Sequence, residues 1–129
     1  MSVKVLVVDD SVLLHKMYDL ALRAYRGCMV EPHFASNGRE GLVQLQAHPE
    51  VQLILLDVNM PTMSGLEFLK QVKAEPAIAG IPVIMQSTED QRGDIERALE
   101  LGATGYLTKP FTPAQLHALL DGVLATAPR

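Results

Sequence analysis

Short apolar runs alternate with amphipathic segments along the whole chain. The runs are rich in branched and aromatic residues and cover residues 3–8, 29–34, 51–56, 81–85 and 105–107. The third run reads VQLILL, nearly continuous rather than alternating, which is typical of a parallel strand covered on both faces. Five strand–helix units in strict alternation predict an α/β fold, doubly wound, with one five-stranded parallel sheet and helices on both of its faces.

The segments between the runs carry apolar residues at helical spacing. The sets are Leu13, Met17, Leu20, Ala21 and Ala24, then Ile95, Ala98 and Leu99, then Leu116, Leu119, Leu120 and Val123. Helix-end signals agree with this division. The start signals are Ser64 with Glu67, Thr112 with Gln115, and Asn37 with Glu40; the stop signals are Gly27 and Gly102.

Composition and charge exclude several classes of function. The 129 residues suit one domain, which we expect over residues 1–125, with residues 126–129 as a tail or the start of a linker. The single cysteine, Cys28, excludes an internal disulfide. No apolar run is long enough to span a bilayer, so we expect a cytoplasmic protein. With a net charge of −4 and no basic face, the chain is not expected to bind nucleic acid or a membrane directly.

Polar side chains stand at the carboxyl ends of the predicted strands, where doubly wound sheets bind their ligands. They are Asp9 and Asp10 after the first run, Asp57 after the third, Ser87 and Thr88 after the fourth, and Lys109 with Pro110 after the fifth. Converging carboxylates repel one another unless a cation lies among them, and their oxygen ligands suit Mg²⁺. A carboxylate nucleophile, a divalent ion and a lysine are the groups that phosphoryl transfer to an aspartate needs. Asp57 is the best candidate nucleophile because its strand is the most apolar, and hence the most central.

Each of these residues taken alone has a simpler structural interpretation. An aspartate after a strand is more often a turn former or a helix N-cap than a ligand. Ser87 or Thr88 could cap the following helix, and Lys109 could be an ordinary loop residue. The functional interpretation depends on all of them meeting at one edge of the sheet.

Four stretches of the chain resemble the receiver domains of two-component response regulators, most of all the single-domain chemotaxis and phosphorelay type. They are VLVVDDS at 5–11, LILLDVNMPTMSG at 53–65, IPVIMQST at 81–88 and GATGYLTKPF at 102–111. Together they extend over essentially the whole chain. The resemblance implies a flavodoxin-like, three-layer (βα)5 sandwich with strand order 2-1-3-4-5, the order known for flavodoxin and for the chemotaxis receiver itself.

The resemblance also implies a role for each site residue. Asp57 would take a phosphoryl group from a phosphohistidine of a sensor histidine kinase or phosphotransfer protein. Asp9 and Asp10 would hold Mg²⁺ together with Asp57 and the backbone carbonyl of Asn59. Lys109 would pair with the phosphoryl oxygens, with a cis bond to the proline that follows it.

A second set of residues would change conformation or tune hydrolysis. Ser87 stands where the family has a hydroxyl that reaches the phosphoryl group; Thr88 is the alternative one residue later, and the spacing to the Lys-Pro pair favours Ser87. Tyr106 stands at the switch-aromatic position and would turn inward as Ser87 moves. Thr88 replaces the small residue usual there, and with Asn59 and Glu89 it would tune self-dephosphorylation.

The resemblance predicts an output surface as well. The fourth helix, fifth strand and fifth helix, roughly residues 91–125, are expected to change shape and dock a downstream target or output domain. Ser87, Tyr106 and Lys109 all lead into that region. Self-phosphorylation and self-dephosphorylation are the only reactions expected of the chain, which is therefore not expected to be an enzyme.

Two other functions are weighed against this one. A Mg²⁺-dependent phosphatase of the haloacid dehalogenase type also uses a strand-end aspartate, but its second aspartate comes two residues later, whereas Asp9 is followed by Asp10 and Ser11. An interaction module that works without phosphorylation would usually have lost an acidic residue or the lysine, and none is lost.

The remaining polar and sulfur-containing residues receive structural interpretations. The histidines show no metal-ligand spacing and are expected at the surface or in helices: His15, His33, His48 and His117. Met17, Phe68 and Phe111 are expected in the core, and Met60 and Met63 are expected to pack the loop after Asp57.

Overall fold

The computed structural model describes residues 2–58, 60, 63–88 and 92–126, and within them strands and helices alternate as the sequence predicts. The strands are β1 (Ser2–Val8), β2 (Met29–Ala35), β3 (Leu53–Asp57), β4 (Val83–Ser87) and β5 (Gly105–Thr108). The helices are α1 (Val12–Arg23), α2 (Gly38–Ala47), α3 (Gly65–Ala74), α4 (Arg92–Glu100) and α5 (Pro113–Thr126).

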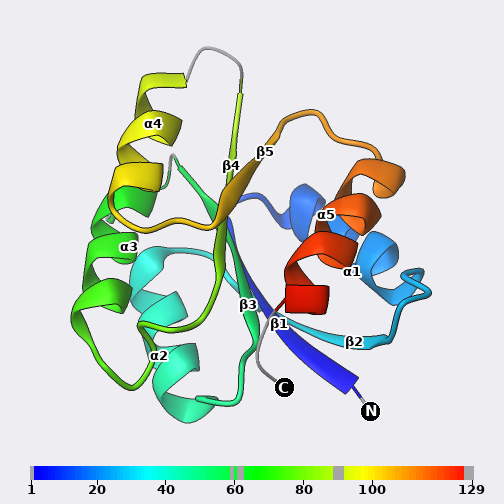
Figure 1. Ribbon diagram of the computed structural model, residues 1–129, viewed down its shortest axis with the longest axis horizontal. Coiled ribbons are helices and arrows are strands. Elements are labelled where there is room, and N and C mark those ends of the chain that lie inside the picture. The colour runs from blue at the N-terminus through cyan, green and yellow to red at the C-terminus, as the bar shows by residue number, and fades with distance from the viewer. Residues whose placement is uncertain (1, 59, 61–62, 89–91, 127–129) are drawn as a thin grey trace.

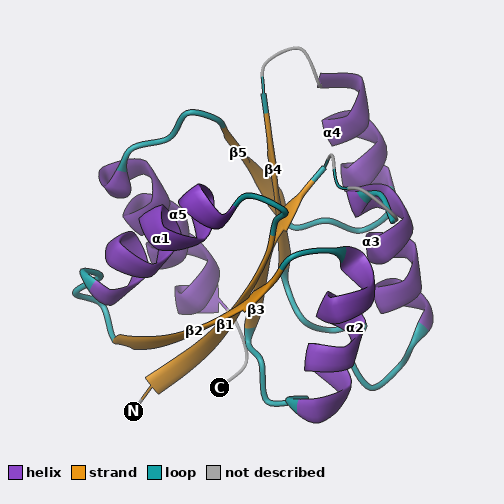
Figure 2. Ribbon diagram, turned by 180° about the vertical axis from the view of Figure 1, so that it is seen from behind, coloured by secondary structure: helices purple, strands orange, loops and turns teal. Residues whose placement is uncertain are grey.

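The strands form one parallel sheet in the order β2-β1-β3-β4-β5, which confirms the expected topology. Figure 1 shows α2, α3 and α4 against one face of the sheet and α1 with α5 against the other. The view from behind in Figure 2 shows the same three layers. β3 lies at the centre of the sheet, so Asp57 ends the middle strand, as its apolar sequence predicts.

Alternate residues of the central strand pack into two separate hydrophobic cores, because successive side chains of a strand point to opposite faces of the sheet. Ile54 and Leu56 pack with the helices α2, α3 and α4. Leu53 and Leu55 pack with α1 and α5. All five residues of β3 are buried, and this explains why its sequence lacks the alternation of a half-exposed strand.

The buried face of α1 differs from the one that the apolar spacing suggests. Leu13, Met17 and Leu20 point to solvent, with Leu20 73% exposed, while Tyr18 and Leu22 are fully buried. The expectation that Met17 belongs to the core is therefore wrong. Two apolar stripes lie on this helix, and hydrophobicity alone does not tell which one faces the sheet.

The helix-start signals lie where they were predicted. Asn37 Oδ1 accepts a hydrogen bond from the Glu40 N–H at 2.9 Å, and Ser64 Oγ accepts one from the Glu67 N–H at 3.2 Å. At α5 the exchange is reciprocal: the Gln115 N–H donates to Thr112 Oγ1 at 3.2 Å and the Thr112 N–H donates to Gln115 Oε1 at 2.9 Å.

One of the two glycine stop signals is correct and the other is wrong. Gly102 has φ of 106°, and the Ala103 N–H donates to the Ala98 carbonyl at 3.0 Å, the pattern of a left-handed helix end. Gly27 does not have a positive φ. The helix α1 ends earlier, at Arg23, and the N–H of the C-cap residue Ala24 donates to the Leu20 carbonyl at 3.1 Å.

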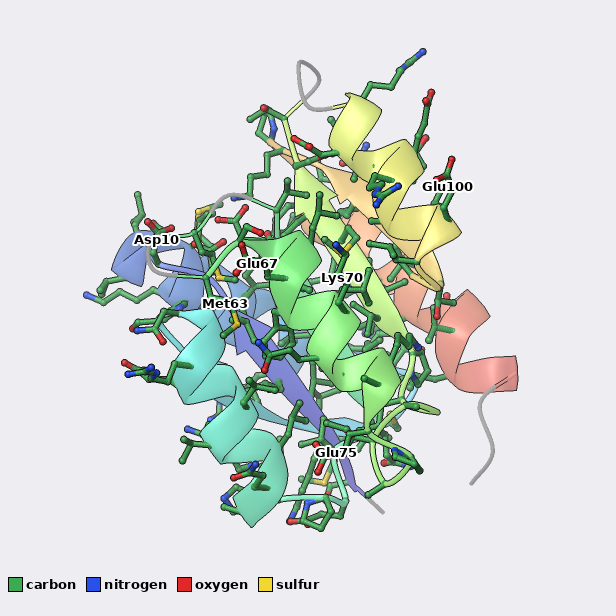
Figure 3. All side chains as sticks on the ribbon, turned by 90° about the vertical axis from the view of Figure 1, so that its left-hand side faces the viewer. Asp10, Met63, Glu67, Lys70, Glu75 and Glu100 are labelled. Carbon is green, nitrogen blue, oxygen red and sulfur yellow. The ribbon has the colours of Figure 1, made fainter. Side chains whose placement is uncertain are left out.

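Charged side chains lie on the outer faces of the helices. Figure 3 shows Glu67 and Lys70 on the side of α3 that faces away from the sheet, and Glu75 just beyond the end of this helix. All three are exposed. Over the described part of the chain, no helix has both the length and the apolar composition needed to cross a membrane.

Candidate functional site

Carboxylates from two adjacent strands meet at the carboxyl edge of the sheet. Asp9 and Asp10 follow β1, and Asp57 is the last residue of the neighbouring strand β3. Carboxylate oxygens of the three residues lie within 4.8 Å of one another. Asp9 and Asp57 are buried, whereas Asp10 is exposed, so the cluster opens to solvent on the Asp10 side.

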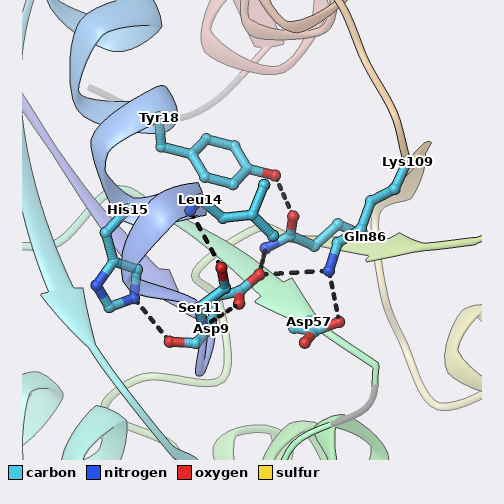
Figure 4. A network of polar contacts seen from close by, with 8 residues as sticks. All are labelled: Asp9, Ser11, Leu14, His15, Tyr18, Asp57, Gln86 and Lys109. Atoms are coloured by element: carbon cyan, nitrogen blue, oxygen red, sulfur yellow. Dashed lines mark hydrogen bonds and ion pairs between the residues drawn. The ribbon is translucent and has the colours of Figure 1, made fainter.

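Lys109 places an ammonium group between two of these carboxylates. Its Nζ lies 3.1 Å from Asp57 Oδ1 and 3.4 Å from Asp9 Oδ2 (Figure 4). The Lys109 backbone N–H donates to the Ser87 carbonyl at 2.6 Å, which ties the end of β5 to the end of β4. The peptide bond between Lys109 and Pro110 is cis, as expected.

The carboxylate of Asp9 is held by donors from three separate parts of the chain. Besides Lys109, the Ser11 N–H donates to its Oδ1 at 2.8 Å, and the Gln86 side-chain amide of β4 donates to its Oδ2 at 3.1 Å. The Asp9 carbonyl accepts a hydrogen bond from His15 Nε2 at 2.6 Å, which places His15 of α1 beside the site. Both oxygens of Asp9 are thereby fixed in direction (Figure 4).

Behind Asp9 lies a buried polar pair that the sequence did not single out. The Tyr18 hydroxyl donates to Gln86 Oε1, and both side chains are almost completely buried. Burial, and after it the negative charges of Asp9 and Asp57, raise the pKa of the Tyr18 hydroxyl above its usual value, so it remains a donor at neutral pH. The available signal was a glutamine inside an otherwise apolar strand, because buried polar groups are normally hydrogen-bonded.

The residues expected to act as a switch lie on β4 and β5. Ser87 is the buried last residue of β4 and pairs with Thr108 of β5, while Thr88 is exposed. Tyr106 is 53% exposed and lines a pocket of about 660 Å³ together with Ser87, Leu99 and other residues of α4 and β5. Asn59 and Glu89 lie outside the described residues.

Gly65, the first residue of α3, lies close to the backbone of Asp57. The Gly65 N–H donates to the Val58 carbonyl at 3.0 Å. A Cβ at this glycine would lie 2.2 Å from the Asp57 carbonyl oxygen, so no larger residue fits without moving the backbone. Met60 and Met63 pack against the core on this side, as expected.

The comparisons with known proteins agree with this arrangement. A family model described as the response regulator receiver domain matches residues 5–121. The chain belongs to this family. A chemotaxis protein CheY homologue of Campylobacter jejuni is 37% identical over 124 residues, covering 95% of this chain and 93% of the relative.

Solved structures show the same fold in two settings. The receiver resembles the chemotaxis protein CheY4 of Vibrio cholerae with a TM-score of 0.84 and 37% identity, covering 95% of this chain and 99% of that one. It also resembles a probable two-component response regulator with a GGDEF domain, with a TM-score of 0.86 and 32% identity. The match to this second structure covers 95% of this chain and 49% of the other chain. The same fold therefore occurs both as nearly a whole chain and as part of a longer one.

The donor set of this receiver fits a hard divalent cation. The clustered ligands are all carboxylate oxygens, and Lys109 neutralises only part of their formal charge. Mg²⁺ prefers oxygen ligands and usually binds through one or a few carboxylates, with water and phosphate oxygens at its other positions. The exposure of Asp10 leaves one side of the carboxylate cluster open to solvent and to ions.

A second group of charged residues lies away from this site, between β2 and the end of α2. His33 and His48 have ring centroids 4.9 Å apart, and they pair with Glu31 and Glu50 respectively. The Lys4 ammonium donates to Glu50 at 2.9 Å and lowers the pKa of that carboxyl to about 2. The fold therefore brings together two histidines that are distant in the sequence.

Proposed function

We propose that this receiver accepts a phosphoryl group on Asp57 from a phosphohistidine of a sensor histidine kinase or phosphotransfer protein. The observation that supports this best is the surroundings of Asp57. It is a buried carboxylate at the end of the central strand, 3.1 Å from the Lys109 ammonium and beside two further carboxylates.

The transfer exchanges one bond to phosphorus for another. A carboxylate oxygen of Asp57 forms a bond to phosphorus while the bond from phosphorus to the histidine nitrogen breaks, and the electron pair stays on that nitrogen. The Lys109 ammonium lies beside the Asp57 carboxylate, so it would pair with an oxygen of the incoming phosphoryl group and stabilise its negative charge.

Mg²⁺ is proposed as the cofactor of this reaction. Asp9, Asp10 and Asp57 would hold it, with the backbone carbonyl of Asn59. When bound, the ion neutralises negative charge on the phosphoryl oxygens and on the carboxylates that they approach. Ser11 and Gln86 keep the Asp9 carboxylate in place.

The signal would leave the site through β4 and β5. Ser87 would move toward the phosphoryl group, Tyr106 would turn from solvent into the adjoining pocket, and the face of α4, β5 and α5 would then dock a downstream target or output domain. Tyr106 is exposed and lines the pocket, which supports this route. Self-dephosphorylation would be tuned by Asn59, Thr88 and Glu89.

The direct test is phosphorylation with a small donor. The protein is incubated with Mg²⁺ and acetyl phosphate, and the modified residue is located by intact mass and peptide mapping. We expect a labile, Mg²⁺-dependent adduct on Asp57 that is absent from Asp57→Ala. Asp19→Ala, which removes a partly exposed aspartate of α1 paired with Arg23, is the matched control and should be phosphorylated normally.

Two other outcomes would replace the proposal. An adduct on Asp9 with turnover of phosphate esters would indicate a phosphatase. No adduct and no Mg²⁺ binding would indicate a receiver that acts as a binding module without phosphorylation.

A further inference from the structure

The buried pair Tyr18 and Gln86 continues the phosphoacceptor site into the protein interior. From the core outward, the Tyr18 hydroxyl donates to Gln86 Oε1, and Gln86 Nε2 donates to Asp9 Oδ2. Lys109 Nζ donates to the same Asp9 oxygen at 3.4 Å and to Asp57 Oδ1 at 3.1 Å. A single chain of hydrogen bonds thus joins helix α1 and strand β4 to the nucleophile (Figure 4).

This chain of hydrogen bonds has a direction. Asp9 as a carboxylate only accepts, so the Gln86 amide must turn its nitrogen toward Asp9, and its oxygen then faces the Tyr18 hydroxyl, which can donate to it. By donating to the amide oxygen, the Tyr18 hydroxyl holds Gln86 in the orientation that presents a donor to Asp9.

Packing alone does not require these polar groups. Tyr18 and Gln86 are 0% and 1% exposed, and Tyr18 lies in a core of apolar residues, with its ring 4.8 Å from that of Phe111. Burying a phenol and an amide there costs free energy that only their hydrogen bonds offset, and apolar side chains of similar volume would fill the same space. The polar pair supplies a hydrogen-bond donor to Asp9, which an apolar pair would not.

We propose that Gln86 and Tyr18 are positioning residues of the phosphoacceptor site: Gln86 fixes the Asp9 carboxylate for the metal, and Tyr18 fixes Gln86. The inference rests on the proposed function, because it assumes that Asp9 is a metal ligand. Gln86 shares one Asp9 oxygen with Lys109, and Ser11 holds the other. Without the Gln86 amide, the Asp9 carboxylate loses one of its hydrogen bonds and is free to rotate toward Lys109.

The test is a Mg²⁺ titration of variants in which the NMR shifts of amides at the site report binding. It is performed well below the unfolding temperature of each variant. Gln86→Met and Tyr18→Phe keep the volume and remove the donor or the group that orients it. Loss of an outer partner of a metal ligand typically weakens metal binding by roughly tenfold or more. We expect a weakening of that order in Gln86→Met, a smaller one in Tyr18→Phe, and slower phosphorylation by acetyl phosphate in both.

Two controls separate positioning from a general loss of stability. Tyr25→Phe removes another hydroxyl, which donates to Asp121 at the surface, and Gln71→Met removes an exposed amide on α3; both should bind Mg²⁺ as the wild type does. Thermal unfolding of every variant shows that it is folded at the titration temperature. If Gln86→Met is not folded at the titration temperature, the test is the Mg²⁺ affinity of Tyr18→Phe compared with that of Tyr25→Phe.

The double variant tests whether Tyr18 acts through Gln86. Because the hydroxyl would reach Asp9 only by orienting the amide, Tyr18→Phe should not weaken Mg²⁺ binding further once Gln86 is Met. Wild-type Mg²⁺ affinity in folded Gln86→Met or Tyr18→Phe overturns the inference, and so do two independent, additive losses. Phosphorylation of the wild type is read separately, so a wild type that binds Mg²⁺ but forms no adduct on Asp57 contradicts the proposed function and not the positioning.

Discussion

At the scale of single residues, the site depends on short contacts that restrict how its side chains and backbone can move. Asp9 receives donors on both carboxylate oxygens, and Gly65 lies against the carbonyl of Asp57. A glycine is needed at position 65 because only a residue without a Cβ lets the first turn of α3 approach the Asp57 carbonyl this closely. Such contacts tie the phosphoacceptor geometry to individual side chains.

Gly65→Ala should destabilise the protein and disturb Asp57. The added methyl would lie 2.2 Å from the Asp57 carbonyl oxygen, so the backbone must shift, which typically costs about 1–3 kcal/mol. We expect a lower free energy of unfolding in urea and slower phosphorylation by acetyl phosphate. Gly80→Ala, where a Cβ meets no atom within 4 Å, is the control. Equal stability of Gly65→Ala and Gly80→Ala would show that the backbone around Gly65 shifts at little cost.

Removal of the Glu50 carboxylate should have a pH-dependent effect on stability. The Lys4 ammonium lowers the pKa of Glu50 to about 2 from an unfolded value near 4.5, so the ionised pair stabilises the protein above pH 4.5 and this is lost as the pH falls toward 2. Urea unfolding of Glu50→Gln should therefore show a deficit at neutral pH that shrinks in acid. A deficit that stays constant down to about pH 3 would contradict the assignment of this ion pair.

At the scale of elements, the type and order of strands and helices followed from the sequence, whereas the orientation of α1 did not. The buried strands and the capping residues Asn37, Ser64 and Thr112 act locally, so they can be recognised locally. The buried face of α1 depends on how the helix docks on the sheet. Its two apolar stripes satisfy the same periodicity, and only contact with the sheet and with α5 distinguishes them.

A matched pair of leucines on α1 tests which stripe is buried. Leu22→Ala should lower the free energy of unfolding by about 2–5 kcal/mol because Leu22 is fully buried in the α1–α5 core. Leu20→Ala, two residues earlier and 73% exposed, should change it by no more than about 0.5 kcal/mol. Urea unfolding of both variants makes the comparison, and a reversed order would show that α1 is rotated about its axis.

At the scale of the whole molecule, the site lies between two regions that can respond to it. The buried chain from Tyr18 reaches Asp9 from the α1 side of the sheet, and Ser87 with Tyr106 leads from the site toward α4 and β5. A phosphoryl group on Asp57 would change the charge at the point where both meet. The response should therefore extend beyond the residues that touch the phosphoryl group.

Phosphorylation should move Tyr106 and the surface of α4, β5 and α5. Tyr106 is 53% exposed beside a pocket, so turning inward would bury apolar ring surface. We expect large amide and tyrosine-ring NMR shifts in these elements on adding acetyl phosphate with Mg²⁺, and none in Asp57→Ala. Shifts confined to the immediate neighbours of Asp57 would mean that this face does not carry the signal.

The sequence by itself determined the order of the elements, the central position of β3 and the residues that gather at the carboxyl edge of the sheet, because strand burial and strand ends leave local patterns. Only the tertiary structure decided which face of α1 is buried, that His33 lies beside His48, and that Tyr18 reaches Asp9 through Gln86. Each of these depends on contacts between residues far apart in the chain. Such contacts follow from how helices dock on the sheet, which no local periodicity specifies.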